Sequence, residues 1–378
     1  MEAPRAVSRE IPGTYDAGTV KEAALHIRQT LGRPAKIAVA FISPDYLPHL
    51  TDFIETLRVD GHITDVVGCT SGGRIVDRLE IEKGSGCVIL AIACDAGDPV
   101  VVHSSDAHCR FPGPRPHGSI LLANPYLFEA DEWLHHWNHE YPAAPCVGGL
   151  ASGGEEEDVA VFLNDRIADA VCLPLTGRTC ILPLVSQGCR PIGEPLTVTR
   201  AENNIVYALG GQPAYEVLET AFESLSDSEK SVAKGNLFAG LAGTEYVEDF
   251  KPGDFLIRNI LGADPGSGAV VIGGIPRTGQ TLQYQLRDRE IAKADLDRVL
   301  ATTALQGIRP FATLLFSCLG RGEKFFGRPN HDASCFYTAA GESPLAGFLG
   351  NGEIAPVARR NAIHNYTAAA AIWVEKSA

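Results

Sequence analysis

The stretch Pro344-Leu345-Ala346-Gly347-Phe348-Leu349-Gly350-Asn351-Gly352-Glu353-Ile354 breaks an apolar run into closely spaced glycines and ends in a carboxylate. Residues 65–75 repeat the same order of strand-like residues, glycine and polar turn, and residues 144–154 are a looser third copy. Glycine adopts backbone angles that side chains forbid and lets backbone amides approach a ligand. One copy alone is typical of a tight turn between strands, whereas three copies suggest a repeated unit.

The segments around these turns have a common order of elements. A buried strand at 36–43, a helix at 46–59, a strand at 65–68 and a strand at 88–93 surround the first turn. Their apolar residues follow strand and helix periodicity, and the same order returns at 119–175 and 312–374. We therefore predict an α/β fold with mixed sheets, whose two domains are built from related strand-helix-strand-glycine-turn-strand units, an internal repeat.

Prolines and glycines cluster between Gly193 and Arg200, before a new helical pattern begins. Such a cluster is typical of a boundary between domains. We predict a flexible leader over residues 1–18, a first domain over 19–195 and a second over 196–378.

Composition limits the classes of partner. The 378 residues contain 32 Lys and Arg against 46 Asp and Glu, a net charge of −14, which repels nucleic-acid backbones and anionic membrane surfaces. The first residues lack the apolar core of a secretory signal, and no apolar run reaches membrane-spanning length. Ten cysteines without such a signal are typical of reduced thiols, so we expect a cytoplasmic protein. From the charge and the short apolar runs we expect no nucleic-acid partner and no membrane span.

The densest group of unusual residues is Phe316-Ser317-Cys318-Leu319-Gly320-Arg321-Gly322. It follows a strand, and α/β folds bind ligands at the carboxyl ends of strands. Arg321 could contact a carboxylate ligand through two parallel hydrogen bonds, next to a reactive Cys318 thiol. In the alternative interpretation Arg321 pairs with Glu353 inside the protein and Cys318 belongs to the core.

These motifs resemble a known family. Residues 312–374 are similar to the C-terminal domain of the FIST family (F-box and intracellular signal transduction proteins), through residues 316–322, 344–354 and 361–367. Residues 66–73 and 147–152 resemble the N-terminal domain of that family. Residues 186–193 and 255–259 resemble the joining stretches of bacterial-type, stand-alone members.

The resemblance implies a sensory or scaffold role, with a small polar metabolite such as an amino acid as ligand. Because the resemblance covers nearly the whole chain, we expect no room for a separate kinase, receiver or F-box module. The output would then pass through an unidentified signalling partner protein. Some relatives are described as haem-binding gas sensors, but the sequence lacks a Cys-x-x-Cys-His attachment site, and we predict no cofactor.

The candidate ligand-binding residues lie in the glycine turns and after the strand that ends at residue 317. They are Cys69, Thr70, Ser71, Gly149, Ser152, Cys318, Gly320, Arg321, Gly322, His331, Asn351 and Glu353. An alternative function is a hydrolase or transferase with Cys318 as thiol nucleophile, but no strong catalytic signature supports it. His135 and His139 lie four residues apart on a predicted helix and could share a metal, although an amphipathic helix explains their segment equally well, so we predict no metal site.

Overall fold

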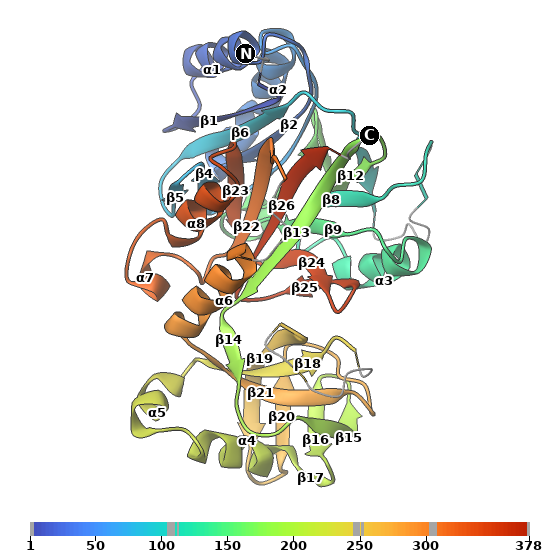
Figure 1. The fold of residues 1–378 in the computed structure, drawn as a ribbon, viewed down its shortest axis with the longest axis vertical. Helices are drawn as coiled ribbons and strands as arrows, with labels where there is room; N and C mark the ends of the chain where they lie inside the picture. Colours follow the sequence, from blue (N-terminus) through green and yellow to red (C-terminus); the bar gives the residue numbers. More distant parts are fainter. Residues whose placement is uncertain are drawn as a thin grey trace. The chain divides into compact units, whose positions relative to one another are not determined.

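The computed structural model describes residues 4–103, 110–111, 113–244, 250, 253–301 and 308–375. The chain divides into two compact units (Figure 1). The first unit comprises Met1–Val185, Asp297–Ile363 and Thr367–Ala378. The second comprises Ser186–Leu296 and His364–Tyr366, so it is inserted between parts of the first.

The first unit contains the same strand-helix-strand motif three times. In each motif two parallel strands flank a helix, and the buried strands are almost entirely apolar, as expected when both faces of a sheet are covered. The motifs are β2 (Ala35–Ile42), α2 (Leu50–Val59), β3 (Ile63–Thr70); β8 (Gly118–Ala123), α3 (Ala130–Glu140), β9 (Cys146–Leu150); and β22 (Ala312–Cys318), α8 (His331–Ala339), β23 (Leu345–Gly350).

After each glycine turn the chain forms a short hairpin that leaves its own sheet. The first hairpin pairs with β23, the second with β3 and the third with β9. The hairpins are β4 (Gly73–Val76) with β5 (Leu79–Ile81), β10 (Val161–Leu163) with β11 (Arg166–Ala168), and β24 (Glu353–Val357) with β25 (Arg360–His364). Because each sheet is completed by a hairpin from another motif, the three motifs depend on one another.

Two further strands finish each sheet, giving three six-stranded sheets with one common order. A closing strand borders the first strand of each motif, and an outer strand borders the closing strand. The closing strands are β6 (Gly86–Ile92), β12 (Ala170–Leu175) and β26 (Thr367–Glu375); the outer strands are β1 (Ala6–Pro12), β7 (Val100–Val102) and β13 (Thr179–Gln187). The largest apolar cluster draws residues from all three sheets.

The first helix, α1 (Ala17–Leu31), starts at an Asp16 cap whose Oδ1 accepts the Thr19 amide at 2.8 Å. It ends at Gly32, whose φ of 63° is the left-handed conformation that glycine favours. With α2 it covers the sheet of β2 and β3 (Figure 1). The shorter helices of the first unit are η1 (Pro44–His49), η2 (Glu156–Asp158) and α7 (Glu323–Phe326).

The second unit is an antiparallel sheet that closes on itself. Because β21 pairs with both β15 and β18, the pairings form a ring of six strands, with β14 and β17 attached outside it. The strands are β14 (Cys189–Pro191), β15 (Leu196–Glu202), β16 (Ile205–Leu209), β17 (Gln212–Pro213), β18 (Leu237–Ala242), β19 (Phe255–Asp264), β20 (Ala269–Ile272) and β21 (Thr281–Arg287).

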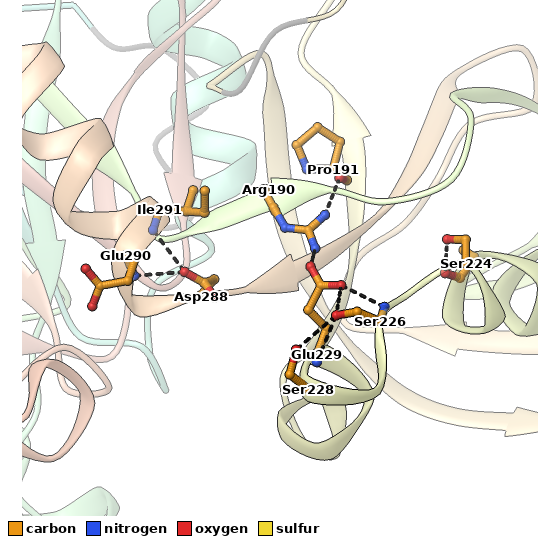
Figure 2. Close-up of polar contacts among 10 residues, drawn as sticks. Arg190, Pro191, Ser224, Ser226, Ser228, Glu229, Asp288, Glu290 and Ile291 are labelled. Atoms are coloured by element: carbon orange, nitrogen blue, oxygen red, sulfur yellow. Dashed lines mark hydrogen bonds and ion pairs between the residues drawn. The ribbon is translucent and has the colours of Figure 1, made fainter.

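Two helices follow β17 in this unit, α4 (Ala214–Glu223) and α5 (Asp227–Ala233), and α6 (Arg289–Ala301) follows β21. Figure 2 shows how α5 begins: Ser226 and Glu229 form a capping box, and the Glu229 carboxylate also pairs with Arg190 of β14. Hydrogen bonds from Ser226 and the ion pair with Arg190 hold the pKa of Glu229 below its usual value. These contacts attach α5 to the rim of the strand ring.

The α/β class and the mixed sheets are confirmed, but the division of the chain differs from the prediction. All three glycine-turn motifs lie in the first unit, and the chain crosses between units at 185/186, 296/297, 363/364 and 366/367 instead of once at 195/196. The first three crossings lie within continuous elements, β13, α6 and β25, so no proline or glycine cluster marks them. The expected flexible leader is wrong for residues 6–12, which form β1 and pair antiparallel with β6.

Candidate functional site

The three glycine turns meet in the first unit and form a closed ring, in which the second turn is hydrogen-bonded to both others and strand pairing of Gly73 with Leu349 joins the first to the third. The Ser152 amide donates to Thr70 O at 3.2 Å, and the Asn351 amide donates to Leu150 O at 3.2 Å. The Ser152 hydroxyl also joins the second turn to both others, since it accepts the Gly72 amide at 3.0 Å and donates to Leu349 O at 2.7 Å. We call residues 70–73, 150–154 and 349–352 the turn ring.

One glycine before each turn explains why the copies look alike. Gly68, Gly148 and Gly347 occupy the same place in the second strand of each motif, opposite a residue of the parallel first strand. A Cβ there would lie only 2.1, 1.8 and 1.8 Å from the carbonyl oxygen of that opposite residue. These glycines let the strands pair closely, and this requirement is structural.

The solvent side of the turn ring is open at a few residues. A Cβ on Gly72 would meet nothing closer than 3.7 Å, and Asn351 is exposed. The Asn351 Nδ2 donates to Ala151 O at 3.3 Å. Leu319 is 46% exposed, and Cys318 and Gly320 beside it are partly exposed. The surface therefore combines backbone groups, one amide side chain and one apolar side chain.

Arg321 has a different partner from the one considered in the sequence. Its Nε and Nη2 bind the two carboxylate oxygens of Asp332 at 2.7 and 3.0 Å, in a fully buried pair. The alternative that Arg321 pairs with Glu353 is thus wrong in the partner, although right in placing the pair inside the protein. Because the fork of Arg321 is occupied by Asp332, the side chain cannot offer that fork to a carboxylate ligand unless the pair breaks.

Asp332 is the centre of this buried cluster. It also accepts the Ser317 hydroxyl at 3.0 Å and contacts His331 Nδ1 at 3.1 Å. Burial acts to raise the pKa of Asp332, but Arg321 and His331 outweigh it and hold that pKa well below its usual range. The His331 ring stacks on Phe326, so it lies in the interior instead of lining an open pocket.

Glu353 lies in the same buried region without a cationic hydrogen-bond partner of its own. Its Oε2 accepts the Thr367 amide at 3.2 Å, while Oε1 has no hydrogen-bond partner among the described residues. Burial raises the pKa of Glu353 well above its ordinary value. Burial thus shifts the equilibrium of this carboxyl toward its neutral form.

The remaining predicted residues form the wall beneath the ring. Cys69 is part of the core, where burial raises its thiol pKa, and Thr70 Oγ1 accepts the Ala160 amide at 3.0 Å. Ser71 is buried, and its hydroxyl has no hydrogen-bond partner among the described residues. Gly149 and Gly322 are closely packed. A Cβ on Gly149 would lie 2.9 Å from the Phe348 ring, and a Cβ on Gly322 would lie 2.4 Å from the Glu82 carboxylate. The structure thus brings the predicted residues together, but it exposes only Asn351, Cys318 and Gly320 among them.

Glu80 of β5 is a titratable group that the sequence reasoning missed. Its Oε1 accepts the Ala333 amide at 2.8 Å at the start of α8. Burial, and then the nearby Asp332 charge, raise the pKa of Glu80 to about 7. The sequence signal was weak, because Glu80 is one of several acidic residues in a short polar hairpin.

This carboxyl should make stability depend on pH. A carboxyl whose pKa is higher in the folded protein binds protons more tightly there than in the unfolded chain. Its contribution to folding stability therefore falls as the pH rises from the pKa of the unfolded chain toward 7. Between pH 5 and 8 we expect the chain to lose about 2 kcal/mol of stability relative to Glu80→Gln, after allowance for partial exposure. Urea unfolding of both proteins at several pH values measures this difference. Glu55→Gln, at an exposed position of α2, serves as the control. Parallel pH curves for the chain and Glu80→Gln would rule the effect out.

The histidine segment of α3 lies apart from these residues in sequence. Trp133 and Trp137 are buried and stacked, while His135 is exposed, as in the amphipathic interpretation. In the described part of the chain no group of three or more His, Cys, Asp or Glu side chains is arranged to hold a metal ion. Within the same residues, no helix is both long and apolar enough to cross a membrane.

All three glycine turns lie in segments that match the models of a known protein family. Residues 36–212 match the FIST N domain and residues 214–356 match the FIST C domain. The chain belongs to the FIST family. FIST domains are linked to signal transduction and sensing.

Full-length relatives support this assignment. Uncharacterized protein Rv0628c of Mycobacterium tuberculosis is 34% identical over 371 residues, which cover 94% of this chain and 95% of the relative. Uncharacterized protein Mb0898c of Mycobacterium bovis is 34% identical over 367 residues, with the same coverage. This FIST protein therefore shares its two-domain sequence with mycobacterial relatives over nearly its whole length.

Proposed function

We propose that this FIST protein is a sensor that binds a small polar metabolite, of the amino-acid class, at the turn ring. The observation that carries the proposal is the closed ring itself, in which turns from three distant segments are joined through the Ser152 hydroxyl. An amino acid has a carboxylate for backbone amides and an ammonium group for carbonyl oxygens, and glycine-rich turns present both kinds of group closely.

The exposed residues at the ring suit such a ligand. Asn351 supplies an amide oxygen and an amide nitrogen, and the open space at Gly72 allows approach to the backbone. Leu319 and the partly exposed Cys318 supply an apolar edge. Arg321 contributes indirectly in this proposal, because its pair with Asp332 holds the strand end that carries Cys318.

The ring also provides a route to a signal. Each turn connects a strand of one sheet to a hairpin in another sheet. A ligand that bridges two turns therefore stabilises one arrangement of the sheets over others, and a partner protein would recognise that arrangement. The output passes through this partner, and cytoplasmic amino-acid levels are the kind of input such a protein would report.

Isothermal titration of the full chain against the twenty amino acids and small carboxylates tests the proposal. We expect at least one compound to bind with a dissociation constant below about 1 mM and Asn351→Ala to weaken it at least about tenfold. Gln29→Ala removes an exposed amide from α1 and serves as the matched control, with unchanged affinity expected. If no compound binds, or if Asn351→Ala binds as well as the parent chain, the proposal fails.

A further inference from the structure

A cavity of about 730 Å³ lies in the first unit, away from the turn ring. It is lined by the start of β1, the end of β6, the start of β22 and the end of β26, through Arg5, Cys94, Phe311 and Glu375. Phe311 precedes the first residue of β22, whereas Cys318 at the other end of that strand pairs with Gly350 of the ring. A strand of seven residues spans about 20 Å, so the cavity and the ring lie at opposite ends of β22.

Three arginines line this cavity in a chain that carries a net charge of −14. Arg5 is already engaged, since it pairs with Glu375 at 2.9 Å and stacks over the Phe311 ring at 4.2 Å. Arg33 makes one long hydrogen bond, from Nη2 to Pro4 O at 3.4 Å. Among the described residues, neither Arg33 nor Arg309 pairs with a carboxylate.

Neither acidic residue of the cavity pairs with Arg33 or Arg309 among the described residues, although the charge of Asp95 leaves the lining as a whole with a net charge of +1. Glu375 pairs with Arg5. The Asp95 carboxylate accepts the Arg178 backbone amide at 3.4 Å. The backbone amide of Asp95 donates to the Thr179 hydroxyl at 3.3 Å. Guanidinium groups bind carboxylates and phosphates through two parallel hydrogen bonds. Two guanidinium groups without a carboxylate partner offer two such forks, so they suit a ligand that presents two carboxylate groups or a phosphate.

The remainder of the cavity is apolar. Its uncharged lining residues include Ile308, Pro310, Phe311 and Val374, and a volume of about 730 Å³ is within the range of small-molecule sites. The positive field of the arginines would concentrate anions there against the negative background of the chain. A ligand that is anionic at one end and carbon-rich at the other matches both parts.

We propose that this arginine cavity, with Arg33 and Arg309 as ligand-binding residues, is a second binding site for a small dianionic metabolite that carries carboxylate or phosphate groups on a short carbon chain. This site goes beyond the proposed amino-acid site. It uses none of the residues of the turn ring, so either site can fail in experiment without the other.

Isothermal titration of the full chain with glutarate, glycerol 3-phosphate and uncharged glycerol tests the second site. We expect one of the two dianions to bind with a dissociation constant below about 1 mM at low salt, more weakly at higher salt, and glycerol not to bind. Binding of glutarate alone identifies a dicarboxylate ligand, and binding of glycerol 3-phosphate alone identifies a phosphorylated one.

Variants connect that binding to the cavity. Arg33→Gln and Arg309→Gln should each weaken the dianion at least about tenfold, because each removes a charge-assisted contact. Arg28→Gln makes the same charge change on the exposed face of α1, outside the cavity, and should change affinity less than about twofold. Asn351→Ala should have no effect, which separates this site from the turn ring. The proposal is overturned if neither dianion binds, or if Arg28→Gln weakens binding as much as Arg33→Gln.

Discussion

Gly347→Ala is expected to destabilise the FIST protein by more than about 4 kcal/mol, enough to leave much of it unfolded at room temperature. The added Cβ would lie 1.8 Å from the Leu315 carbonyl oxygen, an atom of the adjacent parallel strand that cannot rotate away. Relief requires the two strands to separate, which would break the pairing between β22 and β23. This penalty exceeds ordinary overpacking, in which side chains move aside.

Gly262→Ala is the matched control, because Gly262 also lies within a strand, β19, and nothing stands within 4 Å of its Cβ position. Alanine there should be neutral or slightly stabilising. Urea unfolding followed by circular dichroism measures both variants. Equal stabilities for Gly347→Ala and Gly262→Ala would contradict the close strand pairing and, with it, the equivalence of Gly347 to Gly68 and Gly148.

Asp332→Ala is expected to cost about 3–5 kcal/mol, since it leaves the Arg321 guanidinium buried without its anion. The same change removes the acceptor of the Ser317 hydroxyl and the contact of His331 Nδ1. Desolvation of a charge costs more than the loss of one hydrogen bond. The loss should therefore be far greater than that at an exposed ion pair.

Lys21→Ala provides the exposed comparison, because Lys21 lies 3.8 Å from Asp60 on the surface and should cost less than about 1 kcal/mol. The double variant Arg321→Met with Asp332→Leu removes both charges and should recover much of the stability lost in Asp332→Ala. Urea midpoints of the three variants decide the matter. A loss below about 1 kcal/mol in Asp332→Ala would mean that the buried pair does not anchor the strand end.

Much of the first unit follows from apolar patterning. The strands β2, β8 and β22 are continuous apolar runs, and α1 and α2 show helical spacing, so the strand-helix-strand motifs are visible in the sequence. A strand is indicated around β10, but β5, β24 and β25 are not, because strands of three to five residues carry too few residues for a periodic signal. Their exchange between sheets depends on tertiary pairing, which local pattern does not encode.

The candidate site was predicted in part for similar reasons. The glycine pattern indicated three related turns, but it did not indicate that the Ser152 hydroxyl joins Gly72 to Leu349. Arg321 was recognised as unusual, but its partner Asp332 depends on how residues 319–330 fold back to place α8. Glycine positions thus identified the region, and the tertiary structure determined which side chains are buried beneath it.

Ligand binding at the turn ring can be followed amide by amide, since we propose that the ring binds a small polar metabolite. Hydrogen exchange of the full chain, with and without a saturating mixture of amino acids, tests it directly because amides of Gly72, Ser152 and Asn351 report on the three turns separately. We expect exchange to slow in all three turns together when ligand binds, and Asn351→Ala to abolish this protection. Unchanged exchange in the turns, or protection confined to segments outside the ring, would contradict it.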